Sequence, residues 1–383
     1  MQLMAKVKLI TNIEQTNLLR LTMRQANACC DWISNIAWEV KRFGQFGLHK
    51  IVYRNAREAF PELSSEVVIR CEAKVSQAYV LDKKVKRNFK PLGAIEYDAR
   101  LLTWYVNKHE VSIWACGGRL RLAFQCGERQ LELLQGKIGQ PDLVLIDNVF
   151  YLFAPCWVEE GKPIDVQGIL GIDLGIISLA TDSDGQEFSG KDVEKRRRLM
   201  AYRRRNLQRK QTKAAKRKLH TLSGKQSRFQ KNTNHVISKC IVRKAQDTNR
   251  AIALENLTGI RDRAKARRSQ RAQHSNWAFY DLRTKIDYKA QRVGIPVIYV
   301  DPRGTSKTCS RCGYSHKNNR KSQSEFICLS CGFAANADEN AAVNISAKAA
   351  INQPNEHIIV QGVAIAPHIA EYIVGTNCIH SEQ

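Results

Sequence analysis

The sequence predicts an α+β protein of more than one domain, and three observations support this. The chain has 383 residues, which is more than a single hydrophobic core usually serves. Apolar residues recur at helical spacing in its first part and then alternate with polar residues in several short stretches. Four cysteines near the carboxyl end form two CxxC pairs separated by 15 residues, which is typical of a small zinc module.

The amino-terminal part is predicted to be a strand followed by a helical module. Residues 1–10 contain a weak alternation, which indicates the first strand of a β-barrel. Thr11 and Glu14 have capping-box spacing before an apolar stripe, so one helix is expected over about residues 12–42. Ser65 is the expected cap of a second helix. The helical module therefore covers residues 11–95.

The next segment, residues 96–165, is predicted to consist of antiparallel strands that complete the small β-barrel. Alternating apolar residues flank the turn at Gly117-Gly118, and two further apolar runs flank the turn at Asp147-Asn148. Short alternating runs joined by such turns are typical of hairpins.

Residues 166–302 have the element order of an RNase H-type α/β domain. Two apolar strands meet at Gly175, and a third short strand follows a turn at residues 182–185. After a long helical insertion come a buried strand at residues 250–256, a helix containing Trp277, and a strand at residues 296–300. The last helix of this domain is expected at residues 336–350, after a zinc ribbon at residues 303–335. The tail, residues 351–383, has no interpretable motif and is expected to pack against the rest or to be disordered.

The chain is strongly basic, with a formal charge of +25 and a pI near 9.7. Residues 191–250 hold 21 Lys and Arg and 3 Asp and Glu, so +18 of this charge lies in the helical insertion. A field of this sign attracts polyanions, so nucleic acid is the expected partner. The alternative for this segment is a solvated helix face or a disordered tail. The candidate contact residues are Arg196, Arg197, Arg198, Arg203, Arg204, Arg205, Lys210, Lys216, Arg217 and Lys218.

No early stretch is long and apolar enough for a signal peptide or a membrane span. We therefore expect a cytoplasmic protein without a membrane partner. In a reducing compartment, closely spaced CxxC pairs indicate metal binding rather than disulfides. The other eight cysteines are expected to be ordinary core or surface residues.

Three acidic residues are candidates for a metal site. Asp173 is expected in the middle of an otherwise apolar strand and Glu255 at the end of the next one, where an unpaired carboxylate carries a desolvation cost. Asp338 is at the start of the last predicted helix. Carboxylates from strand ends and a helix start fit the requirement of two-metal phosphodiester hydrolysis. Each also has a structural interpretation: Asp173 as an acceptor of backbone N–H groups, Glu255 as a partner of an arginine, and Asp338 as a helix cap.

Cys309, Cys312, Cys328 and Cys331 are the predicted ligands of a structural Zn²⁺ ion, because four thiolates leave no open coordination position. Gly313 and Gly332 each follow a CxxC pair and allow the turn there. Arg320 lies at the expected tip of this ribbon, where it either contacts a phosphate near the carboxylates or is a solvated loop residue.

Several motifs together resemble the TnpB (OrfB) family of transposon-encoded proteins, which is related to the type V CRISPR effectors. The resemblance covers about residues 168–346. Its motifs are Gly171-Ile-Asp-Leu-Gly-Ile, Ala253-Leu-Glu-Asn-Leu, Thr305-Ser-Lys-Thr-Cys-Ser-Arg-Cys-Gly-Tyr, Asn319-Arg-Lys-Ser-Gln, Cys328-Leu-Ser-Cys-Gly-Phe and Ala337-Asp-Glu-Asn-Ala-Ala-Val-Asn-Ile. The order of helical module and barrel before them agrees with the family more loosely. Asn336 departs from it, since many relatives have His there.

The resemblance implies an RNA-guided DNA endonuclease of an insertion sequence, and therefore a nucleoid-associated protein of a prokaryote. In such proteins a guide RNA from the transposon end directs a RuvC-like domain to double-stranded target DNA beside a short adjacent motif. The barrel would then be wedge-like and the helical module a recognition module. Asp173, Glu255 and Asp338 carry over as the Mg²⁺-binding RuvC carboxylates, the four cysteines as zinc ligands, and Arg320 as a phosphate contact. The basic segment would lie against the guide–target heteroduplex.

Two other functions use the same features. One is a guide-dependent DNA-binding repressor that does not cleave. The presence of all three acidic residues argues against it. The other is an RNA-independent transposase or resolvase of RNase H fold. Copurified RNA would separate these hypotheses. The sequence leaves the oligomeric state, the adjacent motif and the cleavage pattern open.

Overall fold

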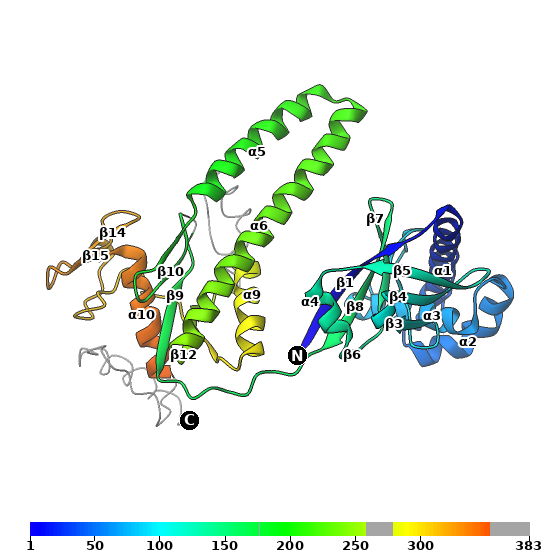
Figure 1. Ribbon diagram of the computed structural model, residues 1–383, viewed down its shortest axis with the longest axis horizontal. Helices are drawn as coiled ribbons and strands as arrows, with labels where there is room; N and C mark the ends of the chain where they lie inside the picture. The colour runs from blue at the N-terminus through cyan, green and yellow to red at the C-terminus, as the bar shows by residue number, and fades with distance from the viewer. Residues whose placement is uncertain (176, 258–278, 353–383) are drawn as a thin grey trace. The chain divides into compact units, whose positions relative to one another are not determined.

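The computed structural model describes residues 1–175, 177–257 and 279–352 (Figure 1). The chain divides into two compact units, Met1–Glu159 and Glu160–Gln383. Most of the predicted tail, residues 353–383, lies outside the described residues, as does Trp277.

The first unit contains three helices before its main run of strands: α1 (Ile13–Glu39), α2 (Gln45–Ala59) and α3 (Ser65–Leu81). The predicted caps are each wrong by one residue. Asn12 and Gln15 make the capping box of α1, because the Asn12 side chain accepts from the Gln15 backbone N–H at 2.8 Å and the Gln15 side chain accepts in return. Ser64, rather than Ser65, caps α3. Helix α2 was not predicted.

The strands of the first unit form one sheet in the order β2-β7-β8-β1-β5-β4-β3, with β6 also paired to β8. All described pairings are antiparallel, which confirms the predicted hairpins. The described pairings form a path from β2 to β3 rather than a closed ring. The elements are β1 (Gln2–Ile10), β2 (Ile95–Glu96), β3 (Leu102–Tyr105), η1 (Val106–Lys108), β4 (Glu110–Ala115), β5 (Gly118–Gln125), α4 (Glu128–Leu134), β6 (Lys137–Ile138), β7 (Asp142–Ile146) and β8 (Val149–Trp157).

Turn residues explain two of these hairpins. Asp147 and Asn148 both have positive φ, 50° and 64°, as the two central residues of a type I′ turn require. Gly117 and Gly118, at 99° and 126°, join β4 to β5. Inward-facing residues of the sheet and of α1–α3 share one hydrophobic core.

The second unit is built on a five-stranded sheet in the order β11-β10-β9-β12-β13. The strands are β9 (Gly168–Asp173), β10 (Ser178–Asp182), β11 (Glu187–Ser189), β12 (Arg250–Glu255) and β13 (Val297–Val300). β9 to β11 pair antiparallel, while β12 pairs parallel with both β9 and β13. This confirms the predicted strand order and the strands on either side of Gly175.

Helices cover both faces of this sheet (Figure 1). On one face, α6 (Lys213–Asp247) and α9 (Phe279–Arg292) pack on Leu170, Ile172, Ile252 and Leu254. On the other face, α10 (Ala337–Asn352) packs on Ile169, Ala251 and Ala253. Helix α5 (Lys191–Lys210) pairs with α6, so the basic insertion is helical as predicted.

The segment between β13 and α10 contains the cysteines. It includes η2 (Lys317–Asn319), β14 (Glu325–Ile327) and β15 (Ala334–Asn336), and the two strands pair antiparallel. Within the described ranges, no helix is both long and apolar enough to span a bilayer.

Candidate active site

Asp173 and Glu255 end two neighbouring parallel strands. β9 and β12 pair with Ile172 opposite Leu254, so the next residues, Asp173 and Glu255, are the last of their strands. Because parallel strands run in the same direction, both carboxylates lie at one edge of the sheet. This edge is where polar groups are expected to collect in an α/β sheet.

Both side chains also belong to the face of the sheet that α10 covers. Successive strand residues alternate between the two faces. Leu170 and Ile172 contact the α6 and α9 side, whereas Ile169 belongs to the core shared with α10. Asp173 therefore follows the alternation onto the α10 side, as does Glu255 two residues after Ala253.

Helix α10 approaches this face closely at Gly171. A Cβ atom at Gly171 would lie 2.0 Å from the Ala342 carbonyl oxygen, so no larger residue fits without displacing the helix. Ser346 Oγ donates to the Ile169 carbonyl at 2.9 Å across the same contact. The amino-terminal turn of α10 is thus fixed relative to β9.

Asp338 lies in that first turn and is nearly buried, with 9% relative exposure. It is not the helix cap. Asn336 Oδ1 accepts the Asp338 backbone N–H at 2.9 Å and so takes the capping role. The Asp338 carboxylate instead accepts from Arg320 Nη2 at 2.8 Å.

The charges of Glu255 and Asp338 affect the ionisation of Asp173. Burial, and after it the negative charges of Glu255 and Asp338, raise the pKa of Asp173 to about 7, while the Arg320 charge opposes them. Burial also raises the pKa of Glu255, against the hydrogen bond from Thr305. The ionisation of Asp173 is therefore opposed by burial and by two neighbouring negative charges, which is the electrostatic situation that a bound cation relieves.

The structural interpretations of these acids hold only in part. Asp173 receives one backbone N–H, from Leu174. Among the described residues Glu255 has no arginine partner, and Thr305 Oγ donates to its Oε1 at 2.5 Å. The arginine is instead on Asp338, so Arg320, predicted to reach a phosphate, contacts a carboxylate here.

The four cysteines form a compact cluster. Their sulfur atoms all lie within 4.8 Å of one another, with Cys309 and Cys331 3.7 Å apart and Cys312 and Cys328 3.6 Å apart. A tetrahedral site with Zn–S bonds of about 2.3 Å requires sulfur separations of about 3.8 Å. In the described part of the chain, this is the one such group of metal-ligating side chains, and the carboxylates are more widely spaced. The cluster indicates structural zinc.

The two halves of the cluster are built alike. Gly313 N–H donates to Cys309 O at 2.9 Å, and Gly332 N–H donates to Cys328 O at 3.0 Å. Gly313 and Gly332 have φ of 75° and 71°, the left-handed conformation that the sequence predicted for them.

Asparagines on α10 hold the zinc segment, and sequence reasoning missed them. Asn344 Nδ2 donates to the carbonyls of Thr305 at 2.9 Å and Thr308 at 2.7 Å, and Asn340 Nδ2 donates to Thr308 O at 2.8 Å. Asn340 Oδ1 also accepts the Ser310 N–H at 3.0 Å. Both asparagines are buried. Their spacing of four residues on one helix, in an apolar context, was the available signal.

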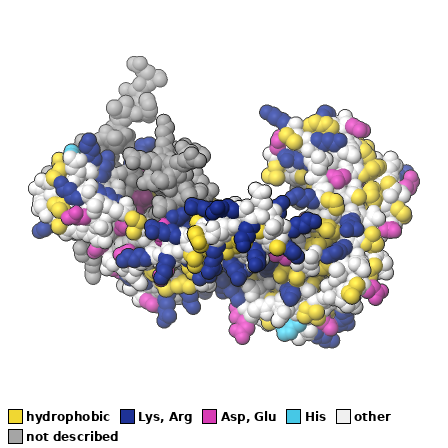
Figure 2. All heavy atoms as spheres, turned by 90° about the horizontal axis from the view of Figure 1, so that it is seen from above, with side chains coloured by type: hydrophobic (Ala, Val, Ile, Leu, Met, Phe, Trp, Pro, Cys, Tyr) yellow, Lys and Arg dark blue, Asp and Glu magenta, His cyan; other side chains and the backbone are white. Residues whose placement is uncertain are grey.

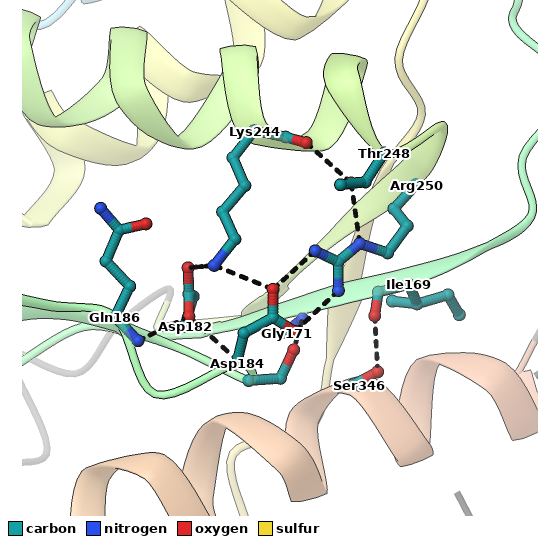
Figure 3. Close-up of polar contacts among 10 residues, drawn as sticks. Ile169, Gly171, Asp182, Asp184, Gln186, Lys244, Thr248, Arg250 and Ser346 are labelled. Carbon is teal, nitrogen blue, oxygen red and sulfur yellow. Dashed lines mark hydrogen bonds and ion pairs between the residues drawn. The ribbon is translucent and has the colours of Figure 1, made fainter. Parts of the chain in front are cut away.

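A second missed cluster fixes the beginning of β12 (Figure 3). Arg250 makes a bidentate contact with Asp184, at 2.9 and 2.7 Å. Lys244 on α6 contacts Asp182 at 2.5 Å and Asp184 at 2.8 Å. These pairs hold the pKa of Asp184 well below its usual value, with the Arg250 hydrogen bond as the largest cause. They join the β10–β11 turn, α6 and β12, and so help to set the register that aligns Glu255 with Asp173.

The candidate nucleic-acid residues lie on the α5–α6 hairpin, over which Lys and Arg side chains gather (Figure 2). Eight of the ten are exposed. The other two are partly buried: Arg197 pairs with Glu194 at 2.5 Å, and Arg204 donates to Gln226 at 2.6 Å. Arg198 is exposed but also contacts Glu194 at 2.8 Å.

Comparison with known proteins now identifies the family. Residues 156–260 match the family described as "Probable transposase" (OrfB_IS605), and residues 279–345 match "Cas12f1-like, TNB domain". A TnpB-like protein of Methanocaldococcus jannaschii is 31% identical over 200 residues, which cover 49% of this chain and 71% of that protein. The chain belongs to the TnpB (OrfB) family. The resemblance deduced from the sequence motifs is thereby confirmed.

Other relatives of this TnpB-family chain are matched over a smaller share of their own length. The CRISPR-associated endodeoxyribonuclease Cas12f1 of Sulfoacidibacillus thermotolerans is 35% identical over 216 residues, covering 52% of this chain and 49% of the relative. The chain thus spans about half the length of this curated relative. Among solved structures, a Cas12f1–sgRNA–target DNA complex matches with a TM-score of 0.63 and 17% identity, covering 86% of this chain and 82% of that one. This likeness shows a Cas12f-like α+β multidomain fold.

Proposed function

We propose that this chain is an RNA-guided DNA endonuclease that cleaves target DNA beside a short adjacent motif. The observation that carries the proposal is the grouping of Asp173, Glu255 and Asp338 on one face and at one edge of the second sheet, where the charges of Glu255 and Asp338 raise the pKa of Asp173. Relatives named as endodeoxyribonucleases and the solved complex with sgRNA and target DNA support it.

The chemistry follows from the three acids. Asp173, Glu255 and Asp338 would hold Mg²⁺ in a RuvC-like site, and the raised pKa values of Asp173 and Glu255 support a site that favours a cation. Bound in pairs, such ions activate a water molecule and stabilise the leaving oxygen of the phosphodiester. The chain's own contribution is to hold the carboxylates on two rigid strands and one helix. Asn336 caps that helix, and Gly171 allows it to lie against β9.

The remaining parts of the chain are assigned by the same proposal. The helical module at residues 11–95 and the wedge-like barrel formed by residues 1–10 and 96–165 help to recognise the adjacent motif. The RuvC-like domain is residues 166–302 with the last helix at 336–350, interrupted by the zinc ribbon at 303–335. The basic α5–α6 hairpin contacts the guide–target heteroduplex through its backbone, since base pairing supplies the sequence specificity.

The test begins with the RNA that copurifies with the chain. Sequencing is expected to find a defined RNA, and with it the protein is expected to cut a library of DNA targets with randomised flanks only when Mg²⁺ is present. Asp173→Ala and Glu255→Gln are expected to abolish cutting while DNA binding persists. Unchanged cutting by both variants refutes the site. Cutting without any RNA supports a transposase or resolvase, and guided binding without cutting supports a repressor.

A further inference from the structure

Thr305 joins the zinc segment to the proposed active site. It lies four residues before Cys309 and is buried, with 2% relative exposure. Its hydroxyl oxygen is 2.5 Å from Glu255 Oε1, the separation typical of a hydroxyl that donates to an ionised carboxylate. Pro302 O lies 2.9 Å from the same hydroxyl. A hydroxyl has one proton, and the shorter contact to a charged acceptor favours Glu255.

The position of Thr305 is itself fixed from the other side. Its carbonyl accepts from Asn344 Nδ2 at 2.9 Å, and this asparagine is buried on α10. The Asn344 side chain is itself held in place, because the same amide group donates to Thr308 O at 2.7 Å. A continuous path of hydrogen bonds thus leads from α10, through the start of the zinc segment, to the carboxylate at the end of β12.

This path of hydrogen bonds restricts the orientation of the Glu255 carboxylate. A glutamate side chain at a strand end has three rotatable bonds, and a buried hydrogen bond to one oxygen restricts them. With Oε1 held by Thr305, the other oxygen is the one that would bind a cation at the edge that Glu255 shares with Asp173. A group that orients a metal-ligating side chain in this way typically changes metal affinity by about 10- to 100-fold when it is removed.

We propose that Thr305 is a positioning residue for Glu255 and that the zinc segment, through Thr305, sets the affinity of the carboxylate site for its divalent cation. This inference rests on the proposed function, because it assumes that Glu255 is a cation ligand. It adds a role for the zinc segment besides folding.

The experiment uses the full chain with its zinc retained and Mn²⁺ as the probe. Isothermal titration is performed on the wild type, Thr305→Val, Thr305→Ser and Glu255→Gln. Valine has nearly the same shape as threonine but no hydroxyl, and serine restores the hydroxyl. Thr308→Val is the matched control, since the Thr308 hydroxyl donates to Ser315 Oγ at 3.1 Å and contacts no carboxylate among the described residues.

The proposal expects Thr305→Val to bind Mn²⁺ about 10- to 100-fold more weakly, while Thr305→Ser and Thr308→Val bind like the wild type. The thermal midpoint without Mn²⁺ and the zinc content should be unchanged in Thr305→Val, which separates positioning from a loss of folding. Equal Mn²⁺ affinity of Thr305→Val and the wild type overturns the proposal and leaves the site intact. A wild type that binds no more Mn²⁺ than Glu255→Gln overturns the proposed site as well.

Discussion

Replacing Asp173 by asparagine should make the cation-free protein more stable. The side chain is held among other acids, and its pKa is raised from the usual 3.8 to about 7 by burial, by Glu255 and by Asp338. Asparagine has nearly the same shape and no charge at any pH. The variant therefore removes the electrostatic cost and keeps the packing.

The size of the effect follows from the pKa difference. About 3 units correspond to about 4 kcal/mol at 1.36 kcal/mol per unit. Because the folded-state pKa is raised, the cost is absent below pH 3.8, grows as the unfolded chain ionises, and is complete above pH 7. Asp173→Asn should thus stabilise the second unit by at most about 4 kcal/mol at pH 8 and by about 2 kcal/mol at pH 5. These are upper limits, since water and Arg320 respond to the ionised form.

Native-state hydrogen exchange of the β9 and β12 amides measures this free energy locally. The buffer contains neither Mg²⁺ nor chelator, so that the cysteine cluster keeps its zinc. Asp165→Asn is the matched control, because Asp165 is exposed in the same unit. Added Mg²⁺ should then stabilise the wild type and not the variant.

Two results would refute this reasoning. One is an Asp173→Asn variant that is no more stable than the wild type at pH 8. The other is a stabilisation of the same size at pH 8 and pH 5, because an electrostatic cost must fall as the carboxylate becomes protonated.

Three further predictions concern the supports of the site. Cys309→Ser should lose zinc and melt at lower temperature, because structural zinc contributes folding free energy; a normal melting curve with full zinc content would contradict the ribbon assignment. Gly171→Ala places a Cβ 2.0 Å from Ala342 O and should cost about 1–3 kcal/mol in urea denaturation, so an unchanged midpoint would show that α10 yields freely. Asp182→Ala removes a buried partner of Lys244 and should cost about 3 kcal/mol; a loss below that of the exposed-site variant Asp165→Ala would argue against the ion-pair cluster.

The sequence was sufficient for features that depend on local pattern. The strands that end at Asp173 and Glu255 are short apolar runs. The order of strands and helices along the chain was enough to predict the type of sheet. The cysteine spacing and the glycines after each pair predicted two similar turns, which the cluster contains. These signals are local because hydrophobic alternation and metal-ligand spacing depend only on residues close together in the sequence.

Features that depend on small energy differences or distant contacts could not be predicted in this way. Adjacent polar residues compete for a cap, so Asn12 was missed beside Thr11. Helix α2 has only a short buried stripe, formed by Leu48, Val52 and Ala56, which does not stand out from its polar surroundings. The contact of Thr305 with Glu255 joins residues 50 apart in the chain, and nothing in the local sequence of either residue specifies it.

The chain separation of the three acids has a consequence for biosynthesis. Asp338 follows Asp173 by 165 positions in the sequence, and it enters the sheet region only when α10 docks on β9. A ribosome must therefore translate beyond α10 before the proposed catalytic centre can form. Abortive products that stop within the α5–α6 hairpin would carry the basic surface but no complete set of acids. Under the proposed function, such a fragment would bind nucleic acid but would not cleave it.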